Sequence, residues 1–204
     1  MDRVGFTFTD LVKIMSRYEP RTTSMFMVAV ATKEVVWTIV RAIRGGLRAY
    51  QWHIENVAFK HDGSLSVKLM NWADNRVVTT HDSLRVRIHT ALVQFSGGLH
   101  PGNYAGKHTN APLVWNGFMN LMHQALNEWI AQWALIHLEQ EGDALPSDEE
   151  MNHLETILLE VVQYTLSQNE VASQTTESRE ESALTTLARS SYGVYAQTAD
   201  SKAT

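Results

Sequence analysis

Residues 112–140 read PLVWNGFMNLMHQALNEWIAQWALIHLEQ, the strongest structural signal in the chain. Large apolar residues recur here every three or four positions, which is the period of an α-helix with a buried face. They are Trp115, Phe118, Met119, Met122, Leu126, Trp129, Ile130 and Trp133. Pro112 stands where a first-turn proline belongs. We therefore predict a long helix from Pro112 to about Gln140, with enough apolar circumference to be buried on several sides.

A second helix follows after a short connector. Ser147 and Glu150 have the spacing of a capping box, in which each side chain bonds the other residue's backbone. The apolar positions after them predict an inner face that continues to about residue 166: Met151, Leu154, Ile157, Leu158, Val161 and Val162. The short connector predicts an antiparallel helical hairpin over residues 112–166. Residues 167–204 are rich in Ser, Thr, Gln and Glu, which predicts a polar C-terminal tail or arm.

The N-terminal half shows the alternation of β-strands. Apolar and polar residues alternate from Tyr50 to Ile54, the phase slips near Asn56, and the alternation returns over residues 65–69. Asp62-Gly63 between these runs is a turn signal, so we predict a β-hairpin here. Leu84–Ile88 also alternates, with Arg85 and Arg87 on its polar side, and predicts a further strand.

Two more helices and a strand are expected before residue 50. Thr9 or Asp10 caps a short helix that runs to Arg17. Met25–Ala31 is short and continuously apolar, which predicts a buried strand. A helix then begins at Thr32 and ends at Gly45-Gly46, because glycine is the usual residue after a helix.

These elements predict a single α+β domain over residues 1–166. It has a basic N-terminal half (1–109) with a small antiparallel sheet, and the helical hairpin (112–166). The chain has 204 residues and no cysteine, so disulfides and thiolate metal sites do not hold it together. The most apolar stretch is interrupted by Lys33, Glu34 and Arg41, and we expect no signal peptide and no membrane span.

Charge is divided unequally between the two halves. Residues 1–109 hold fourteen Lys and Arg against eight Asp and Glu, a balance of +6, whereas residues 110–204 hold three against fourteen, a balance of −11. The balances sum to the net charge of −5. A basic half indicates an anionic partner, and an acidic half indicates a solvated surface or a complement to a basic patch.

The basic residues form a stripe on the helix expected after Thr32. Lys33, Trp37, Arg41 and Arg44 fall within about 80° of one another at 100° per residue, opposite Val35, Val36, Ile39 and Ile43. Arginine suits phosphate binding and base stacking. The expected nucleic-acid-binding residues are therefore Lys33, Trp37, Arg41, Arg44, Arg48, Arg85 and Arg87. The alternative is an ordinary solvated face that is salt-bridged to acidic residues.

No motif predicts catalysis, a cofactor or a metal. The Gly-rich segment from Phe95 to Asn110 is expected to be a long loop, either functional or mobile. It departs from a phosphate-binding loop, because Gly102 and Gly106 enclose three residues and His108 stands where Ser or Thr belongs. The nine histidines include no i, i+4 helical pair that would bind zinc.

We therefore expect a self-assembling structural protein of the viral coat or nucleocapsid type, not an enzyme. It would bind the phosphate backbone of single-stranded nucleic acid, RNA more than DNA, without sequence specificity, and it would form a homo-oligomer through helices 112–166 and the tail. Its expected location is cytoplasmic, and in the virion if the protein is viral. Two alternatives remain: a matrix, connector or scaffold protein that binds anionic lipid or an acidic protein, and a small enzyme that uses the 97–108 loop with His100, His108 or Tyr104 as acid-base groups.

Overall fold

The computed structural model describes residues 4–16, 22–47, 51–60, 66–70, 83–104, 113–137 and 145–170. The chain divides into a unit over Met1–Thr165 and a second unit over Leu166–Thr204, and the packing reported below belongs to the first. That unit is mostly helical with a small antiparallel sheet toward its N-terminus, so the expected α+β class is confirmed. Residues 171–204, most of the expected tail, lie outside the described residues.

The sheet has three strands in the order β1-β2-β3: Val4–Thr7, Val57–Lys60 and Val67–Leu69. Strands β2 and β3 pair antiparallel with Phe59 opposite Val67, which confirms the hairpin, while its turn at residues 61–65 lies outside the described residues. The strand expected up to Ile54 is wrong. Ile54–Asn56 instead forms the 3₁₀ helix η1, because the Asn56 N–H bonds the His53 carbonyl at 2.8 Å and closes a turn.

Helix α1 spans Phe8–Ser16, so the short helix is confirmed but its cap is not the expected one. Thr7 is the cap: its hydroxyl accepts from the Asp10 N–H at 3.0 Å, and the Asp10 carboxylate accepts from the Thr7 N–H at 3.1 Å. This reciprocal capping box begins the helix two to three residues before the expected caps.

Helix α2 spans Thr22–Arg44 without a break, and the expected strand at Met25–Ala31 is wrong. Thr32 is not a cap either, because it lies within the helix and its hydroxyl donates to the Val28 carbonyl at 2.8 Å. The end of the helix is as expected. Gly46 has a φ of 98°, and the Leu47 N–H bonds the Ala42 carbonyl at 3.0 Å, as in a Schellman motif.

Helix α3 spans Leu84–Leu99, so the expected strand at Leu84–Ile88 is also wrong. Ser83 caps it by accepting from the Val86 N–H. The helix continues through the glycines that we assigned to a loop, and a short helix α4 follows at Pro101–Tyr104. Close packing explains the glycine at position 98, because a Cβ there would lie 2.9 Å from the Ile54 side chain.

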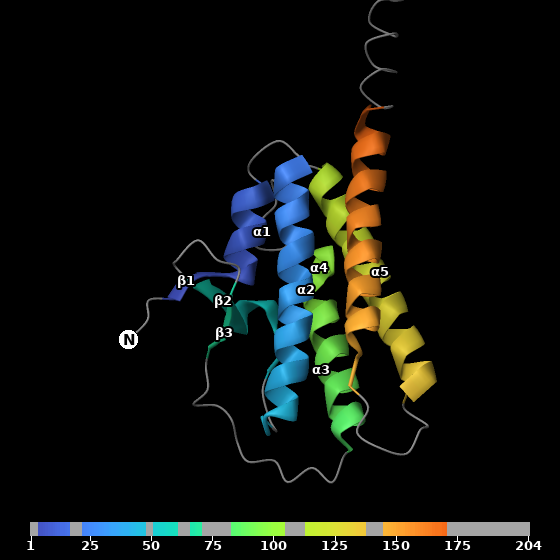
Figure 1. The fold of residues 1–204 in the computed structure, drawn as a ribbon. Helices are drawn as coiled ribbons and strands as arrows, with labels where there is room; N and C mark the ends of the chain where they lie inside the picture. The colour runs from blue at the N-terminus through green and yellow to red at the C-terminus, as the bar shows by residue number, and fades with distance from the viewer. Residues whose placement is uncertain are drawn as a thin grey trace, which may run out of the picture. The chain divides into compact units, whose positions relative to one another are not determined.

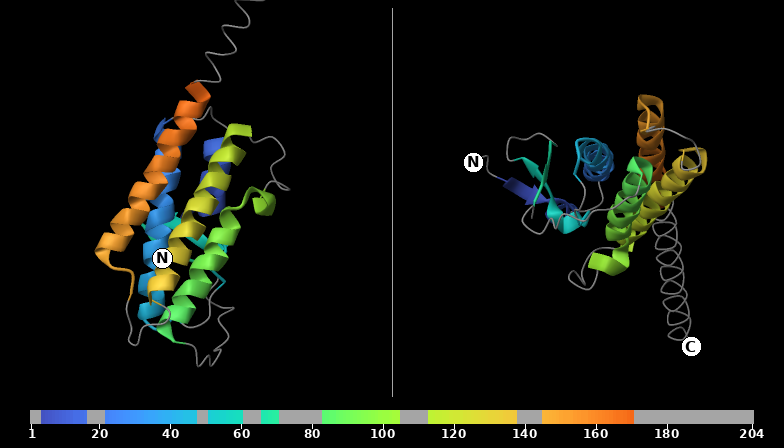
Figure 2. Two further views of the ribbon diagram at one scale, coloured as in Figure 1. Left: turned by 90° about the vertical axis from the view of Figure 1, so that its right-hand side faces the viewer. Right: turned by 90° about the horizontal axis from the view of Figure 1, so that it is seen from below.

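The helical hairpin is confirmed. Helix α5 spans Leu113–His137, and residues 148–170 form the second helix, which continues a turn beyond the expected end. The capping box forms as predicted, with Ser147 N–H to Glu150 Oε2 at 2.7 Å and Glu150 N–H to Ser147 Oγ at 3.2 Å. The two helices run antiparallel, side by side (Figure 2).

The elements are arranged in layers about α2. Figure 1 shows α1 and the sheet on one side of α2, and α3 and α5 on the other. Phe8 joins the layers, because its ring contacts Phe59 of the sheet at 6.1 Å and Phe95 of α3 at 5.7 Å between centroids. Among the described residues, no helix is both long and apolar enough to span a bilayer.

Candidate nucleic-acid interface

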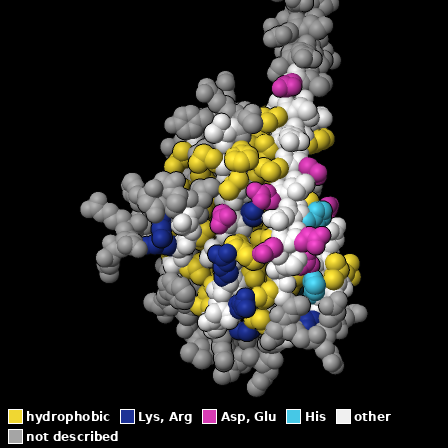
Figure 3. Space-filling view, viewed as in Figure 1, with side chains coloured by type: hydrophobic (Ala, Val, Ile, Leu, Met, Phe, Trp, Pro, Cys, Tyr) yellow, Lys and Arg dark blue, Asp and Glu magenta, His cyan; other side chains and the backbone are white. Residues whose placement is uncertain are grey.

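The exposed side of α2 carries the predicted basic stripe. Val35, Val36 and Ile39 are fully buried, whereas Arg41 and Arg44 are exposed and Lys33 and Trp37 are half-buried. These four residues follow one another at intervals of three or four, so they share one side of the helix. Figure 3 shows the resulting surface, with basic and acidic side chains close together on the face that α2 and its neighbours present.

Lys33 does not lie on this surface as an unpaired cation. It forms an ion pair with Glu155, which belongs to the helix at 148–170. The pair therefore ties α2 to the acidic half of the chain. In this respect the salt-bridged alternative describes Lys33 better than the nucleic-acid interpretation does.

Arg41 and Trp37 form a stacked pair. The Arg41 guanidinium carbon lies 4.6 Å from the centroid of the Trp37 ring. A cation–π contact at an exposed site contributes about 0.5–1 kcal/mol. This holds the planar guanidinium in place beside the indole ring, and both groups are of the kind that bind phosphates and stack on bases.

Within the described residues, no ion pair joins Arg41 or Arg44 to a carboxylate. Both lie in the last part of α2. They differ in this from Lys33 and from Lys13, which lies 3.9 Å from Asp10. Of the predicted set, Arg41 and Arg44 are therefore the exposed cations without a carboxylate partner in the described part of the chain, and Trp37 lies beside them.

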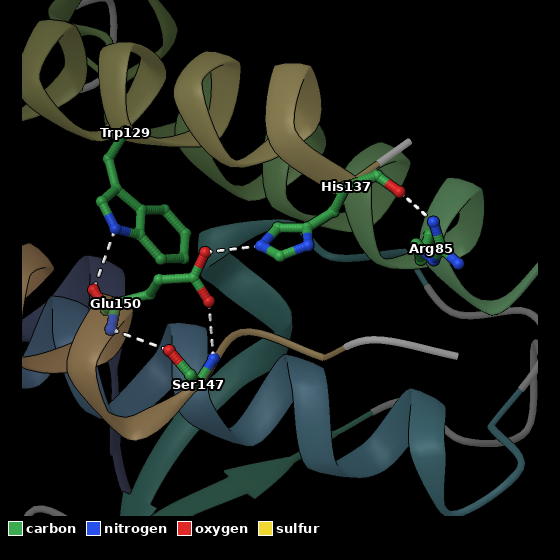
Figure 4. A network of polar contacts seen from close by, with 5 residues as sticks. All are labelled: Arg85, Trp129, His137, Ser147 and Glu150. Carbon is green, nitrogen blue, oxygen red and sulfur yellow. Dashed lines mark hydrogen bonds and ion pairs between the residues drawn. The ribbon is translucent and has the colours of Figure 1, made fainter. Parts of the chain in front are cut away.

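Arg85 is placed quite differently from its prediction. It lies on a helix instead of a strand, is only 4% exposed, and donates a hydrogen bond from its guanidinium to the His137 carbonyl (Figure 4). That carbonyl is at the C-terminal end of α5, where the helix dipole attracts a cation. Arg85 thus joins α3 to α5 and is not available to a ligand. Arg87 is half-buried on α3, and Arg48 lies outside the described residues.

The contact of Arg85 belongs to a polar network that joins three helices (Figure 4). His137 Nε2 lies 2.6 Å from Glu150 Oε1, and the Trp129 indole N–H donates to the Glu150 carbonyl at 3.0 Å. Burial acts to raise the pKa of Glu150, but hydrogen bonds from the Ser147 N–H and from His137 outweigh it, so this pKa lies below its ordinary value. The network stabilises the hairpin, and sequence analysis found only its capping box.

A second cluster bears on the alternative that the 97–108 segment is catalytic. The His123 Nδ1–H donates to the Ser96 carbonyl at 2.8 Å, and His123 Nε2 lies 3.1 Å from the Asn127 amide nitrogen. Because Nδ1 carries the proton, it does not act as a base toward the Ser96 hydroxyl 3.3 Å away, and Ser96 is fully buried. The pair therefore fastens α5 to α3.

The acid-base groups expected for this alternative are His100, His108 and Tyr104, and only the His100 side chain lies in the described residues. His100 stacks edge-on against His123 at 5.2 Å between centroids, and its Nδ1 accepts from the Gly102 N–H. His108 and the Tyr104 side chain lie outside the described residues. In the described part of the chain, no three His, Asp or Glu side chains are grouped as metal ligands.

Comparisons with protein-family models, with curated proteins and with solved structures gave no match to this chain.

Proposed function

We propose that this protein coats single-stranded nucleic acid as a self-assembling structural protein of the coat or nucleocapsid type, and that α2 contacts the phosphate backbone. The observation that carries the proposal is the environment of Arg41 and Arg44. Both are exposed, neither is paired with a carboxylate in the described part of the chain, and Arg41 is stacked on Trp37. Arginine and an aromatic ring side by side suit a backbone phosphate and an adjacent base.

The neighbouring acidic helix limits where a strand can lie. Residues 148–170 contain six carboxylates and no Lys or Arg, and Glu155 of this helix already forms an ion pair with Lys33. These carboxylates repel a polyanion. We therefore place the strand along the C-terminal half of α2, over Trp37, Arg41 and Arg44, and away from Lys33.

Two arginines per copy make weak binding. Neutralising two phosphates gives a log-log salt slope of about −1.4 on a single strand. Such a site gains affinity when neighbouring copies bind the same strand, because later contacts form at a high effective concentration. The sparse interface therefore favours a coating protein that acts in arrays over a monomeric binder.

The test is fluorescence anisotropy of labelled oligo-U and oligo-dT across a salt series. We expect a slope of about −1.4 for the native chain and near zero for the double variant Arg41→Gln/Arg44→Gln. Lys13→Gln/Lys60→Gln is the matched control, since it removes the same charge from other elements and should leave the slope unchanged. Equal losses in both double variants, or no binding at low salt, would overturn the proposal.

A second arm separates nucleic acid from lipid. Vesicles with and without phosphatidylserine test the matrix-protein alternative through the same arginines. Co-sedimentation with the anionic vesicles, without oligonucleotide binding, would reassign α2 to a membrane surface. Oligonucleotide binding that depends on Trp37 supports our proposal, because stacking needs a base.

A further inference from the structure

Helices α3 and α5 pack along one another and share an outer face. They are neighbours in both views of Figure 2, and Ser96 of α3 contacts His123 of α5 along their line of contact. Val93 on α3 and Gln124 on α5 lie within about 100° of that line, on the side turned from the core. Both are exposed, so the two helices present a joint surface, here called the α3–α5 face.

Large apolar side chains are exposed on these two helices. Val86 and Val93 are 40% and 45% exposed and stand two turns apart on one side of α3. Leu135 is 81% exposed and Ile136 is 54% exposed in the last turn of α5. The N-terminal turn of α3 is near this turn, because Arg85 bonds the His137 carbonyl. Val86 and Leu135 therefore belong to the same end of the face, whereas Ile136 points about 100° further round α5.

Charge is almost absent from the face. Among Lys, Arg, Asp and Glu, α3 and α5 contain only Arg85, Arg87 and Glu128. Arg85 is buried, and Arg87 lies about 100° round α3 from Val86, on the side away from α5. Glu128 is exposed and stands two turns before Leu135 on the same side of α5, so the face holds this one carboxylate. Depletion of charge with exposed aliphatic residues is the composition of an interface core.

We infer that the α3–α5 face is where a second copy of this chain binds, face to face about a two-fold axis. This inference deepens the proposed function, on which it rests, by giving the copies a surface through which they join. A surface with a single carboxylate meets its own copy with little repulsion, which a two-fold contact requires. The helix at 148–170, with six carboxylates and no cation, does not meet this requirement.

The size of the face fits this occupant. At 1.5 Å per residue, α3 and α5 are roughly 24 and 37 Å long, and packed helices lie about 8–10 Å apart. Two such helices present roughly 500–700 Å² per copy. A two-fold contact then buries roughly 1,000–1,400 Å² in total, which reaches the lower range of specific interfaces.

The test is sedimentation velocity of the full chain at pH 7.5 without nucleic acid, over a range of protein concentration. We expect a reversible dimer, and we expect Leu135→Glu and Val93→Glu each to weaken it. A two-fold contact contains every substitution twice, so a loss of about tenfold per copy raises the dissociation constant about 100-fold. Ile14→Glu is the matched control: it is a helix-surface change at a side chain 43% exposed on α1, and the dimer should survive it.

Circular dichroism of each variant shows whether its helices remain, so a loss of dimer is not confused with unfolding. A monomeric native chain, or a dimer that Ile14→Glu weakens as much as Leu135→Glu does, overturns the inference. The outcome is separable from that of the proposed function. Arg41→Gln/Arg44→Gln should abolish oligonucleotide binding and leave the dimer intact, while Leu135→Glu should dissociate the dimer and leave the salt slope per copy intact.

Discussion

Arg41 and Arg44 at the end of α2 differ sharply in environment from Arg85 at the start of α3, although these two helices pack together. The α2 arginines are exposed and Arg41 is stacked on an indole ring, whereas Arg85 is buried and bonds the last turn of α5. All three looked alike as cations in an amphipathic sequence. The difference teaches that a cation in a sequence predicts a ligand site only where the fold leaves it without an internal acceptor.

The largest expected effect is on stability, from Arg85→Met. The variant keeps the apolar stem but removes the guanidinium, so the part-buried His137 carbonyl loses its donor. We expect the free energy of unfolding to fall by about 2–3 kcal/mol, measured by urea denaturation. Arg44→Met, the exposed control, should change it by less than about 0.5 kcal/mol. Equal urea midpoints for the two variants would contradict the structural role that we assign to Arg85 alone.

Glu150→Gln tests the other end of the same network. It weakens both the capping box and the contact with His137, so we expect a loss of about 1 kcal/mol at neutral pH. The pKa of Glu150 is lowered in the folded state, so its charge stabilises the fold above its ordinary pKa of 4.5, and this contribution disappears as the pH falls through the lower folded value. Thermal melts from pH 7 to pH 3 should show the native and variant chains converging toward acid. Glu149→Gln, at its exposed neighbour, is the matched control and should change stability at neutral pH by less than about 0.5 kcal/mol.

Trp37→Ala sharpens the description of the α2 surface. It removes the ring beneath Arg41 and the stacking surface for a base, and we expect oligonucleotide affinity to fall by about fivefold, or about 1 kcal/mol. The salt slope should stay the same, because no phosphate contact is lost. Phe26→Ala, an exposed aromatic at the other end of α2, is the control. A changed slope with unchanged affinity would contradict the stacking role.

The smallest effect concerns the Lys33–Glu155 pair. A double-mutant cycle with Lys33→Met and Glu155→Gln should give a coupling energy of about 0.3–1 kcal/mol that decreases with salt, because both side chains are partly exposed. The longer Lys13–Asp10 pair should give less. A coupling energy of zero at low salt would mean that Glu155 does not hold Lys33, and Lys33 would then be added to the binding surface on α2.

Periodicity and local turn signals predicted the two hairpins. The hairpin of α5 and the helix at 148–170 was predicted because its apolar residues keep one period and its capping box is local. The β2–β3 hairpin was predicted for the same reason, from alternation around Asp62-Gly63. In each of these cases neighbours in the sequence supply the decisive contacts.

Two of the three wrong strands were segments whose periodicity is misleading. Met25–Ala31 is continuously apolar, and such a run fits a buried strand and a covered helix equally well. It became part of α2 because no glycine or proline interrupts residues 22–44 and because α1 and α3 pack against the helix. Leu84–Ile88 alternates only because Arg85 is counted as polar and therefore outward, whereas the carbonyl end of α5 lets its guanidinium lie inside.

By itself, the sequence determined the α+β class, the C-terminal hairpin, the end of α2 at Gly45-Gly46 and the charge difference between the halves. These depend on local period, turn chemistry and composition. Only the tertiary structure decided which cations remain exposed, that Glu155 pairs with Lys33 across the two halves, and that α3 and α5 share an exposed face with little charge. These depend on contacts between residues far apart in the chain, and a single sequence does not encode such distances in any local pattern.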